Sequence, residues 1–444
     1  MSVQQIEKED DFSKKNNIDI ITFGCRLNSY ESEVIKNLSS DAGLDNITII
    51  NTCAVTSEAE RQAKQTIRKI RKNNPSTKII VTGCGAQINP DIYAAMDEVN
   101  HVIGNDEKMK PETYHRLSAT TERVLVNDIM SVTETANHLI SGFENKSRAF
   151  IQVQNGCNHR CTFCIIPYGR GNSRSVPIGE IVNQIKLLVK NGVKEIVFTG
   201  VDITSYGEDL PGKPKFGEMV QRILNLVPEL PRLRISSVDP SEIDETFWHV
   251  FATDHRIMPH LHLSLQSGDN VILRRMKRRH LRDDVYQFCD KARTLRPDVV
   301  FGADIIVGFP TESDEMFKNT CNLVEECNIT FLHVFPYSSR PGTPASKITP
   351  LPKAIVKKRA ADLRSIGQSL EENLLKKLVN QKSTMLVEKI TDEHIMGKND
   401  YFIPMRVTLK PTSTLPVENS ILLITATDFQ NGILNADDYT IIEN

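Results

Sequence analysis

The sequence lacks the features that would place it among membrane proteins, secreted proteins or strongly basic proteins. Its 54 Lys and Arg residues are balanced by 56 Asp and Glu residues, which excludes a globally basic nucleic-acid binder but leaves room for a local basic patch. No apolar run approaches the ~18 residues that a membrane helix needs. The first residues, MSVQQIEKEDDFSKKNN, contain no apolar signal-peptide segment. We therefore expect a cytoplasmic protein that does not contact a membrane.

Glycine and proline are also scarce, with 22 and 21 residues in a chain of 444, which excludes collagen-like and low-complexity classes. Hydrophobic residues make up 39% of the chain, enough for sizeable cores, and the length favours about three domains. The nine cysteines need an explanation, because thiols in a cytoplasmic protein stay reduced. We interpret them as core residues, nucleophiles or metal ligands, and not as a set of disulfides.

Three short apolar runs near the start of the chain each end in a cysteine. IDIITFGC ends at Cys25, NITIINTC at Cys53 and TKIIVTGC at Cys84, and helical patterns separate them. Alternating strands and helices favour a parallel sheet, whose ligands bind beyond the carboxyl ends of the strands. We therefore predict an α/β domain over residues 17–130 that brings three distant thiols together. The alternative is three ordinary buried core cysteines.

A second repeat of strands and helices follows, from AFIQVQ before Cys157 to FLHVFPY at Tyr337. Its six units predict a central partial (β/α)6 barrel over residues 145–375, with the active site at the carboxyl ends of the strands. Polar residues or glycine stand at several of these ends. They include Gly200, Asp202, Ser237 and Gln266, and Asp304 lies close to another strand end.

The pattern of apolar residues changes again in the last part of the chain. Residues 378–444 contain short strand-like runs without helical periodicity, which predicts a small all-β domain. Residues 381–444 hold five Lys and Arg residues against nine Asp and Glu residues, so this domain is acidic. A few side chains, such as Lys398, Tyr401 and Arg406, are its candidates for holding a substrate.

The most specific motif is NGCNHRCTFCIIPYGRG, which follows the first strand of the predicted barrel. Cys157, Cys161 and Cys164 have the spacing C-x3-C-x2-C. Three thiolates can hold three irons of a [4Fe–4S] cluster and leave the fourth iron open for a substrate. Phe163 could pack beside a ligand on that iron. The alternative is a zinc site in which His159 is the fourth ligand.

This spacing at the start of a six-unit barrel resembles the radical S-adenosylmethionine (SAM) enzymes. Motifs that include FGCRLNSYESE, INTCAVTSEAE, VTGCGAQINP, RISSVDP and HLSLQSGDNVILRRMKR resemble the methylthiotransferases among them, and the likeness spans about residues 18–344. The resemblance implies SAM and two [4Fe–4S] clusters, one on Cys157, Cys161 and Cys164 and the other on Cys25, Cys53 and Cys84. It also implies that Phe163, Gly200, Asp202, Ser237, Gln266 and Asp304 line the SAM pocket or substrate path, and that the last domain is a TRAM-like module.

The same resemblance implies a reaction in two halves. One SAM methylates a sulfur on the second cluster, and another SAM supplies the radical that removes a hydrogen from the substrate. GCRLNSYESE with NTCAVT is most similar to the branch that acts on N6-threonylcarbamoyladenosine at position 37 of tRNA. The branches that modify N6-isopentenyladenosine 37 or a ribosomal-protein aspartate are alternatives. The implied partners are tRNA, a one-electron donor such as flavodoxin or ferredoxin, and a sulfur source.

Two basic stretches are candidates for contacts with tRNA phosphates. Arg61, Lys64 and Arg68 share one face of a helical pattern, and Arg274 and Arg278 lie in ILRRMKRRHLR. Solvated helix faces are the alternative interpretation of both. A protein of a different class, a zinc-stabilised RNA-binding protein without catalysis, is the rival to the enzyme.

Overall fold

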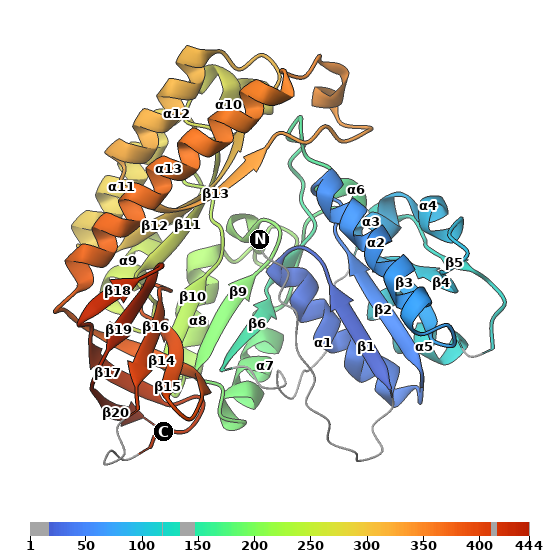
Figure 1. The fold of residues 1–444 in the computed structure, drawn as a ribbon, viewed down its shortest axis with the longest axis horizontal. Helices are drawn as coiled ribbons and strands as arrows, with labels where there is room; N and C mark the ends of the chain where they lie inside the picture. The colour runs from blue at the N-terminus through green and yellow to red at the C-terminus, as the bar shows by residue number, and fades with distance from the viewer. Residues whose placement is uncertain (1–16, 118, 134–146, 410–414, 444) are drawn as a thin grey trace.

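The N-terminal part of the chain forms the predicted parallel sheet. The computed structural model describes residues 17–117, 119–133, 147–409 and 415–443 (Figure 1). Five parallel strands follow one another in chain order: β1 (Ile18–Thr22), β2 (Ile47–Thr52), β3 (Lys78–Gly83), β4 (His101–Ile103) and β5 (Val124–Leu125). Every residue of β2 is buried, as is typical of a strand covered on both faces.

The helices of this part cover the two faces of the sheet. They are α1 (Arg26–Asp41), α2 (Ser57–Asn73), α3 (Cys84–Ile88), α4 (Pro90–Ala94) and α5 (Pro111–Leu117). The start of α2 is capped, since the side chain of Thr56 accepts a hydrogen bond from the backbone N–H of Ala59. Its first turn carries acidic residues and its last turn basic ones, which complements the helix dipole.

The central part forms an open, partial barrel of six parallel strands. One sheet contains β6 (Arg148–Gln152), β9 (Glu195–Thr199) and β10 (Arg232–Ile235), and the other contains β11 (His260–Gln266), β12 (Val300–Val307) and β13 (Ile329–Pro336). Parallel bridges, Leu233 to Ile257 and Val238 to Leu263, connect the two sheets. The predicted fold class, with its partial barrel, is therefore confirmed.

Helices lie between the strands of the barrel and on its outside. They are α6 (Ile166–Arg170), α7 (Ile178–Lys190), α8 (Phe216–Leu226), α9 (Glu245–Thr253), α10 (Asn270–Met276), α11 (Arg282–Leu295), α12 (Asp314–Glu326) and α13 (Lys353–Leu378). A short antiparallel pair, β7 (Gln154–Asn155) and β8 (Arg174–Ser175), brackets the loop that carries Cys157, Cys161 and Cys164. Figure 1 shows α13 along the outside of the barrel and α1 of the N-terminal part beside β6.

The C-terminal part is a seven-stranded sheet, as predicted for an all-β domain. Its strands are β14 (Lys382–Ile390), β15 (His394–Asn399), β16 (Pro404–Thr408), β17 (Ile421–Thr425), β18 (Asp428–Gln430), β19 (Ile433–Ala436) and β20 (Tyr439–Glu443), in the order β18-β19-β16-β15-β14-β17-β20. Leu375 at the end of α13 packs into the core of this sheet. None of the helices in the described ranges has the length and apolar character needed to cross a bilayer.

Candidate functional site

The first cysteine trio lies at one edge of the N-terminal sheet. Cys25 precedes α1, Cys53 follows β2, and Cys84 begins α3 directly after β3. Burial, and after it the nearby Cys84 and Cys25, raise the pKa of the Cys53 thiol to about 12. The structure therefore brings the three thiols close enough for their charges to interact.

Two glycines let the chain turn sharply into this trio. Gly24 has φ +103°, and a Cβ built on it would lie 3.0 Å from Sγ of Cys53. Gly83 has φ +93°, and a Cβ there would lie 2.3 Å from the backbone oxygen of Thr52. Both positions require glycine, because the backbone is left-handed and there is no room for a side chain.

The second trio lies on the loop before α6. Burial raises the pKa of the Cys157 and Cys164 thiols to about 12, with Asp202 as the next cause for Cys157. The charges of the three thiols also repel one another. Sγ of Cys161 lies 3.7 Å from Nη1 of Arg278, so a guanidinium stands beside this trio.

Helix α6 connects the two trios. Ile165, which directly follows Cys164, packs against Ala54 and Cys84 of the N-terminal part. A Cβ on Gly169 would lie 3.2 Å from Cβ of Cys84. Asn105 donates one hydrogen bond to the carbonyl of Gly169 and contacts Sγ of Cys84 at 3.7 Å. The two sets of thiols therefore lie on neighbouring sides of one short helix.

A buried ionic network lies against the first trio. Glu31 accepts hydrogen bonds from Arg170 at 2.9 Å and 3.1 Å, and from Nζ of Lys108 at 2.6 Å. Burial opposes ionisation of Glu31, but Arg170 and Lys108 lower its pKa to about 2. Two cations face one carboxylate, and the field of Arg170 reaches Cys84 and Cys25. Sequence reasoning missed Glu31, although it lies in FGCRLNSYESE, and Lys108, because nothing in the chain order shows that they meet Arg170.

The predicted pocket residues occupy different surroundings. Oδ2 of Asp202 lies 2.7 Å from Nε2 of His159 and accepts a hydrogen bond from Ser205 at 2.8 Å. Gly200 has no room for a side chain, since a Cβ would lie 2.8 Å from the carbonyl oxygen of Gln154. Gln266 ends β11 with φ +70°, a strained conformation for this residue type.

The remaining predicted pocket residues lie on or next to three different elements. Ser237 is half-buried, two residues beyond β10. Phe163 packs against the apolar cluster of Met276 and Phe309. Asp304 accepts hydrogen bonds at 3.0 Å from His262 and from His333, on the two strands that flank β12.

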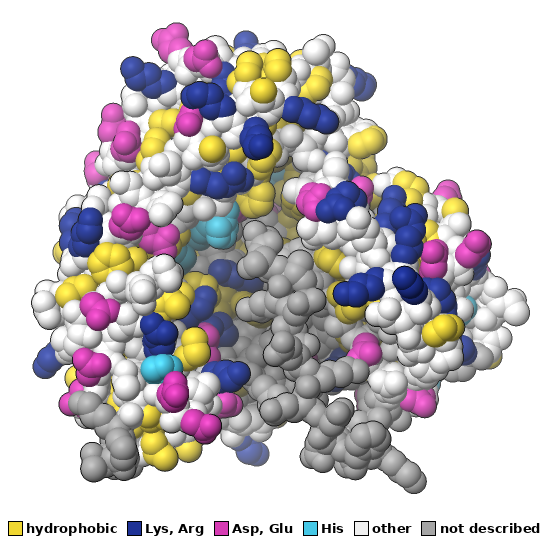
Figure 2. All heavy atoms as spheres, viewed as in Figure 1, with side chains coloured by type: hydrophobic (Ala, Val, Ile, Leu, Met, Phe, Trp, Pro, Cys, Tyr) yellow, Lys and Arg dark blue, Asp and Glu magenta, His cyan; other side chains and the backbone are white. Residues whose placement is uncertain are grey.

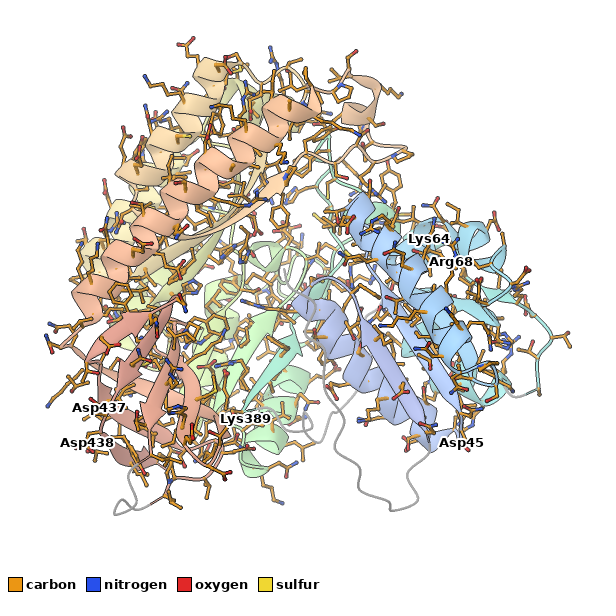
Figure 3. The ribbon with its side chains drawn as sticks, viewed as in Figure 1. Asp45, Lys64, Arg68, Lys389, Asp437 and Asp438 are labelled. Carbon is orange, nitrogen blue, oxygen red and sulfur yellow. The ribbon has the colours of Figure 1, made fainter. Side chains whose placement is uncertain are left out.

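The structure separates the predicted RNA-binding residues into two groups. Arg278, a candidate for a tRNA phosphate contact, donates hydrogen bonds to Asp239 and to the carbonyl of Ser264, both at 2.7 Å, beside Cys161. Arg61 is paired with Glu58 at 2.5 Å, which neutralises much of its charge. Lys64, Arg68 and Arg274 have no ion pair among the described residues, and Figure 3 shows Lys64 and Arg68 together on α2.

The donor sets fit iron–sulfur clusters better than zinc. Each trio offers only sulfur ligands, three to a site, which leaves one corner of a [4Fe–4S] cluster free. A zinc site would need His159 beside all three thiols of its loop. His159 instead faces Asp202, and within the described ranges these two residues come together with Cys157 alone of the three.

Comparisons with known proteins agree with this geometry. The Radical SAM superfamily model matches residues 151–324, and the model of uncharacterized protein family UPF0004 matches residues 17–104. The threonylcarbamoyladenosine tRNA methylthiotransferase MtaB of Rickettsia prowazekii is 55% identical over 395 residues, which cover 88% of this chain and 92% of the relative. The chain belongs to the radical SAM methylthiotransferase family, in its MtaB branch.

Other relatives within and beyond this branch are less similar. MtaB of Aquifex aeolicus is 36% identical, over 84% of this chain and 94% of the relative. A tRNA-2-methylthio-N(6)-dimethylallyladenosine synthase of Ehrlichia chaffeensis is 29% identical, over 93% of this chain and 98% of the relative. The radical SAM methyltransferase TsrM of Kitasatospora setae, solved with a [4Fe–4S] cluster, shares the fold with a TM-score of 0.57 at 14% identity, over 75% of this chain and 77% of that one.

Proposed function

We propose that this protein converts N6-threonylcarbamoyladenosine at position 37 of tRNA to its 2-methylthio derivative, with SAM as co-substrate. The observation that carries the proposal is the pair of cysteine trios on either side of α6. The 55% identity to an MtaB over most of both chains supports the choice of nucleoside. The reaction takes place in the cytoplasm, where tRNA is modified.

Each trio has a separate role in this proposal. Cys157, Cys161 and Cys164 hold the SAM-binding cluster, and Cys25, Cys53 and Cys84 hold the second cluster. When bound, the two clusters and SAM supply one-electron reduction, the carbon radical, the methyl group and the site for the sulfur. The protein supplies position and charge, and it buries Cys53, Cys84 and Cys161 away from water.

Charged side chains near the trios prepare them for these groups. Arg170 and Arg278 place positive charge beside thiols that must be deprotonated to bind iron. Asp202, held by His159 and Ser205, presents a carboxylate 3.9 Å from Sγ of Cys157, where it can accept hydrogen bonds from SAM. Gly200 keeps the adjoining space free of a side chain.

The tRNA approaches across the face that carries α2. Lys64 and Arg68 present positive charge there without an ion pair to any described residue, and basic side chains gather along this helix in Figure 2. The acidic C-terminal sheet contributes less to phosphate contacts. A flavodoxin or ferredoxin delivers the electrons, and a separate sulfur source renews the sulfur that is transferred.

The alternatives are weaker. The curated relatives named above, two MtaB proteins and one dimethylallyladenosine synthase, carry tRNA in their names, which favours RNA over a ribosomal-protein aspartate. The dimethylallyladenosine relative is less similar than either MtaB. A zinc-stabilised binding protein would need a ligand set that His159 does not complete. Anaerobic metal analysis should find about eight irons per chain, not one or two zinc ions.

Nucleoside mass spectrometry tests the function. Cells that lack the gene should lose 2-methylthio-N6-threonylcarbamoyladenosine and recover it with the wild-type gene. With purified protein, Cys157→Ala should abolish SAM cleavage, whereas Cys25→Ala should keep SAM cleavage and block methylthiolation. Cys321→Ala, a half-buried cysteine of α12, is the matched control and should keep both activities. Methylthiolation by Cys25→Ala would contradict the division of roles, and loss of the isopentenyl product instead would change the substrate.

A further inference from the structure

All three parts of the chain meet around the ring of Phe402. The ring centroid lies 5.5 Å from the guanidinium carbon of Arg26, 5.0 Å from that of Arg148 and 4.9 Å from that of Arg234. Nζ of Lys398 lies 3.8 Å from the same centroid. Arg26 comes from the N-terminal part, Arg148 and Arg234 from the barrel, and Lys398 from the C-terminal sheet. Four cations therefore surround one aromatic ring.

Two of these cations have carboxylate partners. Arg148 pairs with Glu195 at 2.7 Å and also with Glu388, and Arg234 pairs with Glu195 at 2.9 Å. These ion pairs connect β6, β9 and β10 to one another and to the C-terminal sheet. Arg148 and Arg234 are therefore already paired with carboxylates, as buried charges need to be, and they stabilise this contact.

Arg26 and Lys398 have no such partner. Neither has a carboxylate within 4.0 Å among the described residues, although both are half-buried. Burial lowers the pKa of Lys398 to about 8, and the nearby Arg148, Arg234 and Arg26 contribute to this shift, while Glu388 opposes it. Burial lowers the pKa of Arg26, and the acids that oppose this shift, Asp304 and Glu195, already have partners of their own.

The space around the ring of Phe402 adjoins the first cysteine trio. Arg26 directly follows Cys25 of the first trio, and His333 of the facing strand β13 is exposed. In Figure 2, histidine and basic side chains lie on the edge of the barrel part that faces the N-terminal part. An anionic group that entered here would meet, among the described residues, two cations without a carboxylate partner, and one of them stands next to the first trio.

We propose that Arg26 and Lys398 form a carboxylate-binding subsite that selects the substrate. The inference rests on the proposed function, since the threonylcarbamoyl group carries a carboxylate and the isopentenyl group carries none. The guanidinium of Arg26 can donate two N–H groups to the two oxygens of a carboxylate, and the ammonium of Lys398 adds a second positive charge. The histidines on Asp304 offer further polar contacts for the hydroxyl of the same group.

The test uses anticodon stem-loop RNAs that differ only at this carboxylate. Equilibrium binding to the iron-loaded enzyme is measured without SAM, for RNA carrying the free acid and for RNA carrying its methyl ester. The wild type should bind the acid about tenfold more tightly than the ester. Arg26→Gln and Lys398→Gln should each remove most of this preference, and Arg26→Lys should restore part of it. Lys389→Gln, an exposed lysine of β14 labelled in Figure 3, is the matched control and should keep the preference.

The outcomes separate the possible errors. Equal losses for acid and ester would mean that the two cations bind tRNA phosphates, and the subsite proposal would fall. Lys398→Gln does not change the chain next to Cys25, because Lys398 lies far from Cys25 in the sequence. The iron content of this variant can be measured to show that both clusters are present. Since binding is measured without turnover, a wild type that prefers the acid but does not methylthiolate it would contradict the proposed function alone.

Discussion

Glu31 illustrates how one buried residue holds two parts of the chain together. Its carboxylate comes from α1, and its partner Arg170 lies 139 residues later, at the end of α6. The side chains of Glu31 and Lys108 are almost completely buried, so the pair is shielded from salt. An isolated buried carboxylate would be costly, whereas this one is surrounded by donors.

At the residue scale we predict that Glu31→Gln destabilises the apo protein by about 3 kcal/mol. The pKa of Glu31 is lowered from 4.5 to about 2, so its contribution is present above pH 4.5 and is lost as the pH falls toward 2. The variant should therefore lose less stability than the wild type between these pH values. Urea unfolding followed by the fluorescence of Trp248 measures both effects.

Glu58→Gln is the matched control for this prediction. Its pKa is also lowered to about 2 by Arg61, but the pair is exposed on α2. Solvent screens such pairs, so the urea midpoint should hardly move. Equal effects of the two substitutions would show that burial of Glu31 does not matter.

At the scale of elements, the turns between strands and helices position the first trio. Each cysteine follows a parallel strand, and glycines with positive φ stand before Cys25 and Cys84. Parallel strands end at the same sheet edge, so three such turns bring their cysteines together. Helix α6 then packs the second trio against this edge through Ile165.

We predict that Gly24→Ala removes the cluster held by Cys25, Cys53 and Cys84. The cluster on the loop before α6 should remain. A Cβ at Gly24 would lie 2.9 Å from Cβ of Cys53, in a left-handed backbone. Iron should fall from about eight to about four per chain, while SAM cleavage continues. Gly43→Ala is the control, because Gly43 also has positive φ but no atom lies within 4 Å of its added Cβ. Full iron in Gly24→Ala would show that the turn tolerates a side chain.

At the scale of the whole molecule, charge is distributed unevenly although the net charge is only −2. Lys64 and Arg68 lie on the N-terminal face, and Asp437 and Asp438 lie on the C-terminal sheet, well apart from them in Figure 3. A polyanion is therefore attracted to one side of the molecule and repelled by the other.

We predict that the double variant Lys64→Gln, Arg68→Gln weakens tRNA binding and reduces its salt dependence, with a slope smaller by about one to two. Titrations of labelled tRNA at several KCl concentrations measure both. Arg61→Gln should have a smaller effect, because Glu58 already pairs with Arg61. An unchanged slope in the double variant would remove α2 from the RNA-binding face.

Local sequence patterns were sufficient for the layout of the fold and for the six cysteines. Apolar strands that end in Cys25, Cys53 and Cys84 reveal a shared sheet edge, and the spacing of Cys157, Cys161 and Cys164 places them on one loop. The partner of Arg278 could not be predicted from its basic run, because the fold brings Asp239, which lies 39 residues earlier in the chain, beside this one side chain.

What the sequence alone determined is therefore the order of strands and helices and the chemistry of the thiols, since both depend on short-range periodicity and spacing. Only the tertiary structure decided that Glu31 meets Arg170, that Arg26 and Lys398 share the ring of Phe402, and that Asp304 is held by two histidines. These contacts join residues from separate sheets, and such long-range pairings leave no periodic signal in the chain.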